Sequence, residues 1–123
     1  MLNGIKILVA EDNLINQKIA NYVLLKQGAD VLNATNGEQA IDMLINNKID
    51  VILMDLQMPG KNGFEAAKYI RNVLKNNIPI IALTADLFAH QNHENDDSGI
   101  NAFIVKPFDP VSLCELIQKL LKK

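Results

Sequence analysis

The sequence lacks the features of several large classes of protein. Its single cysteine, Cys114, excludes an internal disulfide framework, and its apolar runs are far too short to cross a bilayer. There is no basic excess, because 12 Lys and Arg residues face 14 Asp and Glu residues. We therefore expect no direct contact with nucleic acid or an anionic membrane. No signal peptide is evident, so we expect a cytoplasmic location.

Several chemical motifs are missing as well. The glycines form neither a G-x-G-x-x-G fingerprint nor a Walker loop, and neither Ser98 nor Ser112 lies in a G-x-S-x-G elbow. His90 and His93 have helical spacing, but the stretch is strongly polar and is interpreted as a solvated face. Cys114 stands among leucines and is interpreted as a packing residue.

What is present is the composition of an ordinary globular domain. The chain has 123 residues, of which 49% are hydrophobic and 21% charged. This length is sufficient for one complete hydrophobic core. We expect a single domain over residues 1–123.

Short apolar runs alternate with helical patterns along the whole chain. Strands are expected at 5–10, 31–35, 51–54, 78–83 and 102–105. Helices are expected at about 13–28, 37–46, 63–74, 85–98 and 110–121, the fourth being short because it is very polar. The inward stripes are predicted to be Ile15, Ile19, Tyr22 and Val23; Ala40, Ile41, Leu44 and Ile45; Phe64, Ala67, Ile70 and Leu74; and Leu113, Leu116, Ile117, Leu120 and Leu121. Five such repeats predict a parallel sheet between two helical layers, although periodicity alone leaves the strand order open.

Polar residues follow the strands at their carboxyl ends, which meet at one edge of a parallel sheet. They are Glu11, Asp12, Asp55, Thr84 and Lys106. A carboxylate at such a position can simply cap the next helix, and for Asp12 alone that alternative stays open. Capping does not explain a lysine and a threonine at the same edge.

Three neighbouring carboxylates require positive charge. At ~4 Å and an effective dielectric near 20, each like-charge pair costs about 4 kcal/mol. Lys106 supplies one charge, and Mg²⁺ suits the remaining oxygens better than zinc, because neither Cys nor His belongs to the group. A metal, a lysine and a hydroxyl together suit a phosphoryl group, and Asp55 is the natural carboxylate nucleophile.

Four ordered motifs resemble a known family. They are Ile7-Leu8-Val9-Ala10-Glu11-Asp12-Asn13, Ile52-Leu53-Met54-Asp55-Leu56-Gln57-Met58-Pro59, Ile81-Ala82-Leu83-Thr84-Ala85 and Val105-Lys106-Pro107-Phe108. Together they resemble the receiver (response-regulator) domain of two-component phosphorelays, and are most similar to receivers of hybrid sensor histidine kinases. The resemblance covers essentially the whole chain.

The resemblance implies a flavodoxin-like (βα)5 fold, doubly wound, with strand order 2-1-3-4-5. It implies that Asp55 is the phosphoacceptor and a metal ligand. Asp12 would be a direct Mg²⁺ ligand, Glu11 a direct or water-mediated one, and Gln57 a ligand through its backbone carbonyl.

The same resemblance implies roles for residues around the phosphoryl group. Thr84 would donate a hydrogen bond to it, and Lys106, before a cis Pro107, would pair with it. Phe103 occupies the aromatic switch position, although an ordinary core aromatic is an equally open interpretation. Gln57 and Asp86 match the variable positions that adjust water access.

These features predict a phosphoacceptor switch. Asp55 would take a phosphoryl group from a phosphohistidine on a sensor histidine kinase or a histidine phosphotransfer domain. The chain would then be a cytoplasmic regulator or the cytoplasmic part of a membrane-bound hybrid kinase. One alternative is an Mg²⁺-dependent phosphohydrolase, which usually has a second Asp where this chain has Gln57. Another is a binding module that no longer accepts phosphate.

Overall fold

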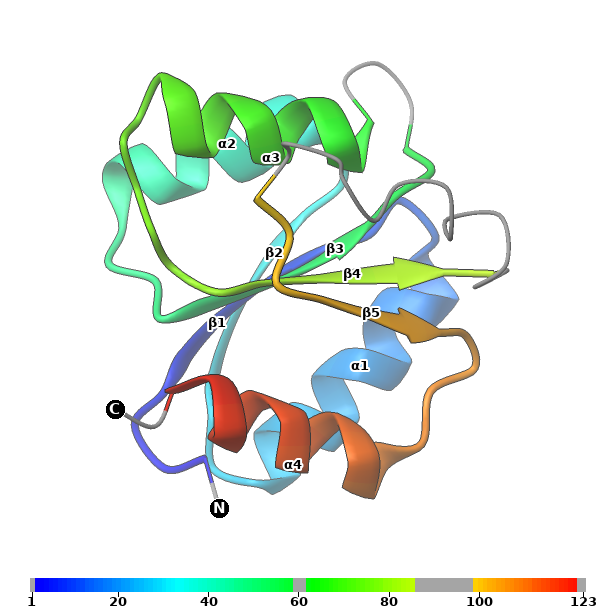
Figure 1. Cartoon of the computed structure of the whole chain (residues 1–123). Helices are drawn as coiled ribbons and strands as arrows, with labels where there is room; N and C mark the ends of the chain where they lie inside the picture. Colours follow the sequence, from blue (N-terminus) through cyan, green and yellow to red (C-terminus); the bar gives the residue numbers. More distant parts are fainter. Residues whose placement is uncertain (1, 59–61, 86–98, 122–123) are drawn as a thin grey trace.

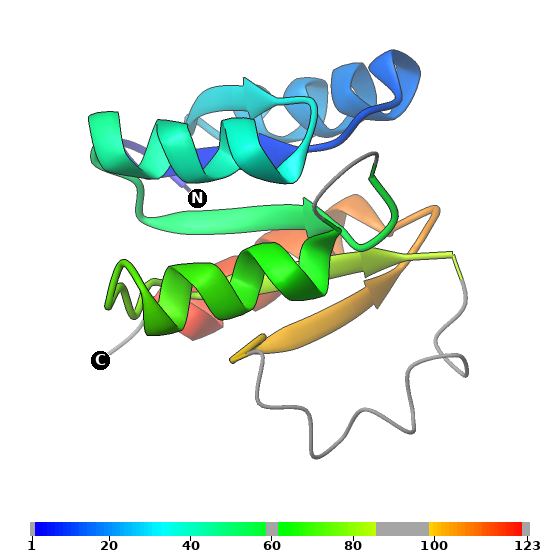
Figure 2. The ribbon, with the colours of Figure 1, turned by 90° about the horizontal axis from the view of Figure 1, so that it is seen from above.

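The computed structural model describes residues 2–58, 62–85 and 99–121. They form a parallel sheet between two layers of helices, with α2 and α3 on one face and α1 and α4 on the other (Figures 1 and 2). The elements are β1 (Lys6–Ala10), α1 (Leu14–Lys26), β2 (Asp30–Ala34), α2 (Gly37–Asn46), β3 (Val51–Asp55), α3 (Gly63–Asn72), β4 (Ile80–Thr84), β5 (Ala102–Val105) and α4 (Pro110–Leu121). The helix expected over 85–98 lies, apart from Ala85, outside the described residues. No helix of the described ranges is both long and apolar enough to cross a membrane.

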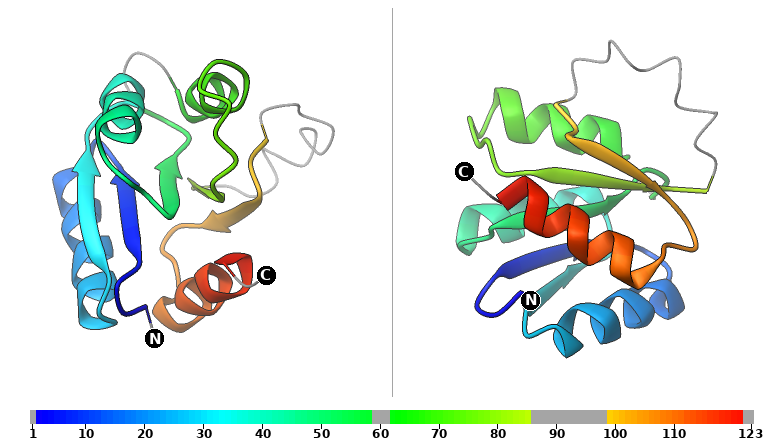
Figure 3. Two further views of the ribbon diagram at one scale, coloured as in Figure 1. Left: turned by 90° about the vertical axis from the view of Figure 1, so that its left-hand side faces the viewer. Right: turned by 60° about the horizontal axis from the view of Figure 1, so that its bottom comes forward.

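The strand order is β2-β1-β3-β4-β5 and every pairing is parallel. This confirms the flavodoxin-like arrangement that the resemblance implied. In the register, Asp55 is opposite Leu83 and Thr84 is opposite Val105. The carboxyl ends of the strands consequently share one edge of the sheet (Figure 3).

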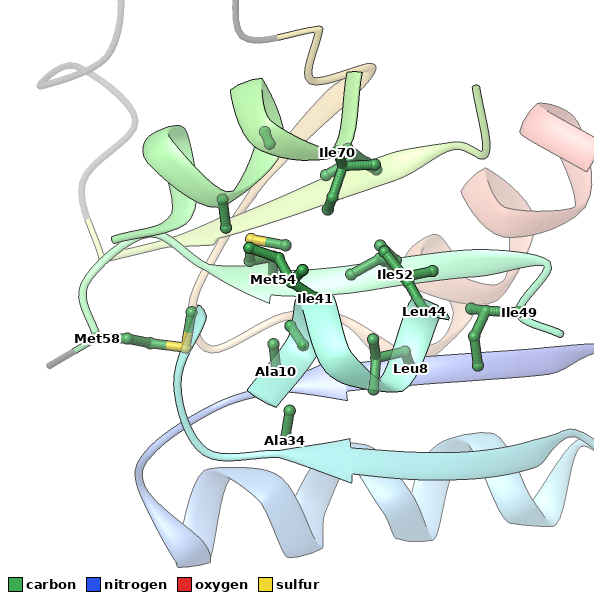
Figure 4. Packing of buried hydrophobic residues seen from close by; sticks show 14 residues of the cluster. Leu8, Ala10, Ala34, Ile41, Leu44, Ile49, Ile52, Met54, Met58 and Ile70 are labelled. Carbon is green, nitrogen blue, oxygen red and sulfur yellow. The ribbon is translucent and has the colours of Figure 1, made fainter. Parts of the chain in front are cut away.

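The hydrophobic core has two halves, one on each face of the sheet. Alternate residues of the central strands enter opposite halves, so that Leu8 and Ile52 face α2 and α3 while Ile7 and Leu53 face α1 and α4. Figure 4 shows the first half, with Ile70 of α3 above the strands. Full burial of one such side chain contributes roughly 1.5–3 kcal/mol, and burial on both faces explains the uninterrupted apolar runs.

Asparagine side chains cap the first three helices. Asn13 accepts a hydrogen bond from the amide of Asn16 at 3.0 Å, and Asn36 accepts one from Gln39. At α3, Asn62 and Glu65 form a reciprocal capping box. Asn13, and not Asp12, therefore satisfies the start of α1, which answers the capping alternative for Asp12.

The predicted inward face of α1 is wrong at three of its four positions, the exception being the half-buried Val23. Ile15, Ile19 and Tyr22 are 70%, 52% and 67% exposed, whereas Ala20 and Leu24 are buried against the sheet. The helix carries apolar side chains on both faces, so a 3.6-residue period fits the outward stripe as well as the inward one.

The stripes of the other helices are mostly as predicted. On α2, Ala40, Ile41 and Leu44 are buried, but Ile45 is 59% exposed and its predicted burial is wrong. The inward positions of α3 and α4 pack into the two halves of the core, or are half-buried against them.

Candidate functional site

Three carboxylates meet at the carboxyl edge of the sheet. Glu11 and Asp12 follow β1, and Asp55 ends the neighbouring strand β3. One oxygen from each of the three lies within 4.8 Å of the others. Glu11 and Asp55 are only 1% and 5% exposed, whereas Asp12 faces solvent. The predicted convergence of these three residues is confirmed.

Lys106 reaches this cluster from the edge strand β5. Its Nζ donates a hydrogen bond to Asp55 Oδ2 at 3.1 Å and lies 3.5 Å from Glu11 Oε1. Burial acts to lower the pKa of Lys106, but the hydrogen bond and charge of Asp55, followed by the charge of Glu11, outweigh it and leave the pKa raised. The ammonium group is therefore fully charged at neutral pH.

The buried Glu11 has the environment of a cation ligand. Burial, followed by the adjacent Asp55, raises the pKa of Glu11 to about 7. Apart from the ion pair of Oε1 with Lys106 at 3.5 Å, neither of its carboxylate oxygens has a partner within the described residues, and no hydrogen bond reaches either of them. Leaving such oxygens unpaired is costly, and an oxygen-preferring divalent cation would relieve both the unpaired acceptors and the crowded charge. The donor set thus fits Mg²⁺.

The side chain of Asp55 is held at both oxygens. Oδ1 accepts a hydrogen bond from the backbone amide of Gln57 at 2.9 Å, and Oδ2 accepts the one from Lys106. The first turn of α3 packs directly against this strand end, because a Cβ on Gly63 would lie 2.8 Å from the Asp55 carbonyl oxygen. Only glycine allows α3 to begin so close to Asp55.

The structure describes two of the three remaining predicted residues, Thr84 and Phe103. Thr84 is 5% exposed at the end of β4, and its carbonyl accepts the backbone amide of Lys106 at 2.7 Å. The half-buried ring of Phe103 lies 6.4 Å from the ring of Phe64. Asp86 lies outside the described residues.

Two of the predictions near Lys106 and Asp55 have different outcomes. The Lys106-Pro107 bond is cis, as the resemblance implied. The side chain of Gln57 is exposed, and ligation of a metal by its carbonyl stays a prediction.

An apolar pocket adjoins the cluster on the side of α1. Its lining includes Glu11, Asn16, Ile19, Lys106 and Phe108. No site role is predicted from the sequence for Asn16, Ile19 or Phe64. The place of Asn16, one helical turn after Asp12, was a usable signal; the exposure of Ile19 was not readable from its apolar character.

The model of the response regulator receiver domain family matches residues 7–118. The chain belongs to this family. The receiver domain is 41% identical over 120 residues to hybrid signal transduction histidine kinase I of Dictyostelium discoideum. That match covers 91% of the chain but only 7% of the much longer kinase.

Solved structures resemble the receiver domain over nearly its whole length. The receiver of sensor histidine kinase PA1611 from Pseudomonas aeruginosa, which has magnesium coordinated in its active site cleft, is 33% identical with a TM-score of 0.84. The alignment covers 96% of this chain and 98% of that one. The receiver of Ssk1 from Saccharomyces cerevisiae, crystallised with the phosphotransfer protein Ypd1, gives 32% identity and a TM-score of 0.87, covering 98% and 90%.

Proposed function

We propose that Asp55 is the phosphoacceptor of this receiver domain. The observation that carries the proposal is a buried carboxylate with one oxygen on Lys106 and the other on a backbone amide, beside two further carboxylates. In the reaction, an Asp55 oxygen forms a bond to phosphorus while the bond from phosphorus to the donor's imidazole nitrogen breaks. The chain supplies orientation, and the donor supplies the energetic phosphoryl group.

The proposed metal ligands are Asp12, Glu11 and Asp55, with the carbonyl of Gln57 completing the protein's share. When bound, Mg²⁺ supplies positive charge to the phosphoryl oxygens. Lys106 then holds the acceptor oxygen and pairs with the phosphoryl group, because its ammonium already lies 3.1 Å from Asp55.

We assign the switch to Thr84 and Phe103. Thr84 would donate its hydroxyl to the phosphoryl group, which draws this side chain inward, and the ring of Phe103 would fill the space vacated. Phe103 lacks the phenolic hydroxyl of a tyrosine, so a partner would read the switch through packing. Gln57 and Asp86 would set the access of water to the acyl phosphate.

The acceptor role is tested with acetyl phosphate and Mg²⁺ on the purified chain. Intact mass should increase by one phosphoryl group, with loss of acetate, and Asp55→Asn should show no increase. Asp42→Asn, a change to an exposed carboxylate of α2, is the matched control and should be labelled like the wild type. An unlabelled, folded wild type, or a labelled Asp55→Asn, would contradict the proposal. Multiple turnovers of the phosphodonor would favour the phosphohydrolase instead.

We propose that the phosphodonor, a histidine kinase or a histidine phosphotransfer domain, docks on α1. This helix exposes five large apolar side chains, at Leu14, Ile15, Ile19, Tyr22 and Leu25. The row begins two residues after Asp12, and the pocket beside Ile19 extends to Lys106. A partner with an apolar helical face would therefore cover α1 while its phosphohistidine reaches Asp55.

The choice of phosphodonor allows docking on α1 to be tested separately from the acceptor role of Asp55. Ile15→Glu, at a 70% exposed position that does not line the pocket beside Lys106, should slow labelling by a phosphorylated histidine phosphotransfer protein and leave labelling by acetyl phosphate unchanged. Ile45→Glu is the matched control, because Ile45 is 59% exposed on the opposite helical layer. Equal rates of protein-donor transfer for both variants would exclude α1 as the docking face.

The wider context of the chain is also a proposal. We propose that residues 1–123 form one receiver domain on the cytoplasmic side, as a free regulator or as part of a hybrid kinase. The resemblance to histidine kinases of several organisms supports the second arrangement.

A further inference from the structure

Arg71, near the end of α3, makes an unusually complete set of hydrogen bonds. Its Nε and Nη2 both donate to the carbonyl of Gly99, at 3.2 and 2.8 Å. Nη1 donates to the carbonyls of Asn76 and Ile78 at 2.8 and 2.7 Å, and Nη2 also donates to Asn101 Oδ1 at 2.9 Å. One side chain thus connects α3, the segment that leads into β4 and the residues that lead into β5.

The acceptors are themselves built into the sheet. Asn101 Oδ1 also accepts the amide of Ile80 at 2.8 Å, and the amide of Asn101 donates to the Ile80 carbonyl at 2.9 Å. Gly99 has a φ of +82°, and a Cβ there would lie 2.6 Å from the Arg71 side chain. The Arg71 side chain therefore packs directly against Gly99, and its guanidinium connects the residues before β5 to the residues before β4.

The residue type is selective in this position. Arg71 is the only arginine in the chain, whose other eleven basic residues are all lysines. A planar guanidinium can donate from three nitrogens in fixed directions, whereas an ammonium is a single point donor. A lysine could not reach all four acceptors at once.

β5 is the strand that most needs such an attachment. It has four residues, pairs with β4 alone among the described strands and is half-buried or exposed along its length, whereas β1, β3 and β4 are largely buried. Lys106 follows β5 directly, while the three carboxylates follow β1 and end β3. The position of Lys106 relative to Asp55 therefore depends on an edge strand.

We propose that Arg71 is a positioning residue that fixes the start of β5 and, through this strand, the ammonium of Lys106 opposite Asp55. The proposal rests on the proposed function, because it concerns the step in which Lys106 acts. Loss of the Arg71 contacts should slow phosphoryl transfer to Asp55 but should not weaken Mg²⁺ binding. The metal ligands lie on other strands, and moving the Lys106 ammonium away leaves their negative charge less offset.

The test compares wild type, Arg71→Lys and Arg71→Met, with Lys119→Met on exposed α4 surface as the matched control. The labelling rate with acetyl phosphate at saturating Mg²⁺ should fall about tenfold in both Arg71 variants. The Kd for Mg²⁺, from amide NMR titration, should be equal to or lower than that of the wild type, whereas a general distortion of the site would raise this Kd together with the loss of rate. Adding Arg71→Met to Lys106→Met should slow labelling no further, because both act through Lys106.

A wild-type rate for Arg71→Lys, or a Kd for Mg²⁺ that weakens in proportion to the rate, would overturn the proposal. If Arg71→Met does not fold, Asn101→Ala, which removes an acceptor of Nη2, replaces it with the same expectation. If the wild type is not labelled, the proposed function of Asp55 is contradicted instead. Hydrogen exchange of the backbone amides then tests whether Arg71 holds β5 in place. If Arg71→Met speeds amide exchange over the wild type more in Ala102–Val105 than in Lys6–Ala10, the role of Arg71 is supported. Exchange rates equal to those of the wild type in Ala102–Val105 overturn it.

Discussion

At the scale of single residues, Glu11 shows how much of the site's energy is electrostatic. Its carboxylate is buried next to that of Asp55, and at ~4 Å such a pair repels by about 4 kcal/mol when the effective dielectric is near 20. Lys106 offsets one negative charge of three. The fold therefore holds an acidic site that a divalent cation should stabilise.

Mg²⁺ is accordingly expected to raise the Tm of the chain. At ten times its Kd, a ligand that binds only the folded state adds about 1.4 kcal/mol to the free energy of unfolding. Asp12→Ala should abolish the increase, since it removes a ligand without touching the core. Differential scanning fluorimetry with and without MgCl₂ measures the effect, with Asp42→Ala as the exposed control. A Tm that is insensitive to tens of millimolar Mg²⁺ in the wild type would contradict the metal site.

Asp109 predicts a pH dependence of stability. Hydrogen bonds from the hydroxyl and amide of Ser112, at 2.8 and 3.1 Å, lower the pKa of Asp109 at the start of α4. The folded pKa lies below the ordinary value of 3.8, so the ionised group stabilises the fold above that pH. This contribution is lost as the pH falls through the lowered pKa.

Urea unfolding at about pH 7 and about pH 3 measures this contribution. Asp109→Ala should unfold at a lower urea concentration than the wild type near neutral pH, and the difference should narrow at the acidic value. Asp109→Asn keeps an acceptor for Ser112 but cannot titrate, so its advantage over Asp109→Ala should not change with pH. A wild-type advantage over Asp109→Ala that is constant from neutral to acidic pH would refute the assignment.

At the scale of helices and strands, the sequence was most informative for elements whose hydrophobic pattern fits a single type of structure. The strands before Glu11 and Asp55 are apolar throughout, and their ends could be placed within one or two residues. The convergence of Asp12, Asp55 and Lys106 followed from parallel strands sharing an edge. The strand order came from the resemblance, because periodicity carries no information on which strands are neighbours.

The misplaced face of α1 has the opposite cause. A helix with apolar residues on both sides offers two stripes of similar quality, and only packing against β1 and β2 decides between them. Small Ala20 permits a close approach to the sheet, while larger Ile15 and Ile19 are left outside. Contacts such as those of Gly63 with Asp55, or of Arg71 with Gly99, depend on distant segments meeting and have no local signal.

The orientation of α1 gives a sharp comparison of two substitutions. Leu24→Ala should lower the free energy of unfolding by about 2–5 kcal/mol, because it leaves a cavity at a fully buried position. Tyr22→Ala, at a 67% exposed position, should change it by about 0.5 kcal/mol or less. Chemical denaturation of both variants measures the difference. Equal losses would mean that α1 is rotated from the orientation described here.

At the scale of the whole molecule, one layer of helices supports the site and the other adjoins its entrance. α3 packs against the backbone of Asp55 through Gly63, whereas α1 contributes Asn16 and Ile19 to the pocket beside Lys106. The division suggests that substitutions on α3 change the chemistry of labelling, and that substitutions on the outer face of α1 change the choice of donor.

The amino end of β1 and the carboxyl end of α4 lie on the side of the sheet away from the strand arrowheads (Figures 1 and 2). A bulky tag, such as a fluorescent protein, can therefore be genetically joined at either end without blocking access to the three carboxylates. Acetyl phosphate should label amino- and carboxyl-terminal fusions as fast as the untagged chain, as gel-shift or mass measurements would show. A fusion that blocks labelling from one end alone would mean that this end reaches the acidic edge. The same geometry allows the domain to be joined to other proteins through either terminus while the acidic site stays accessible.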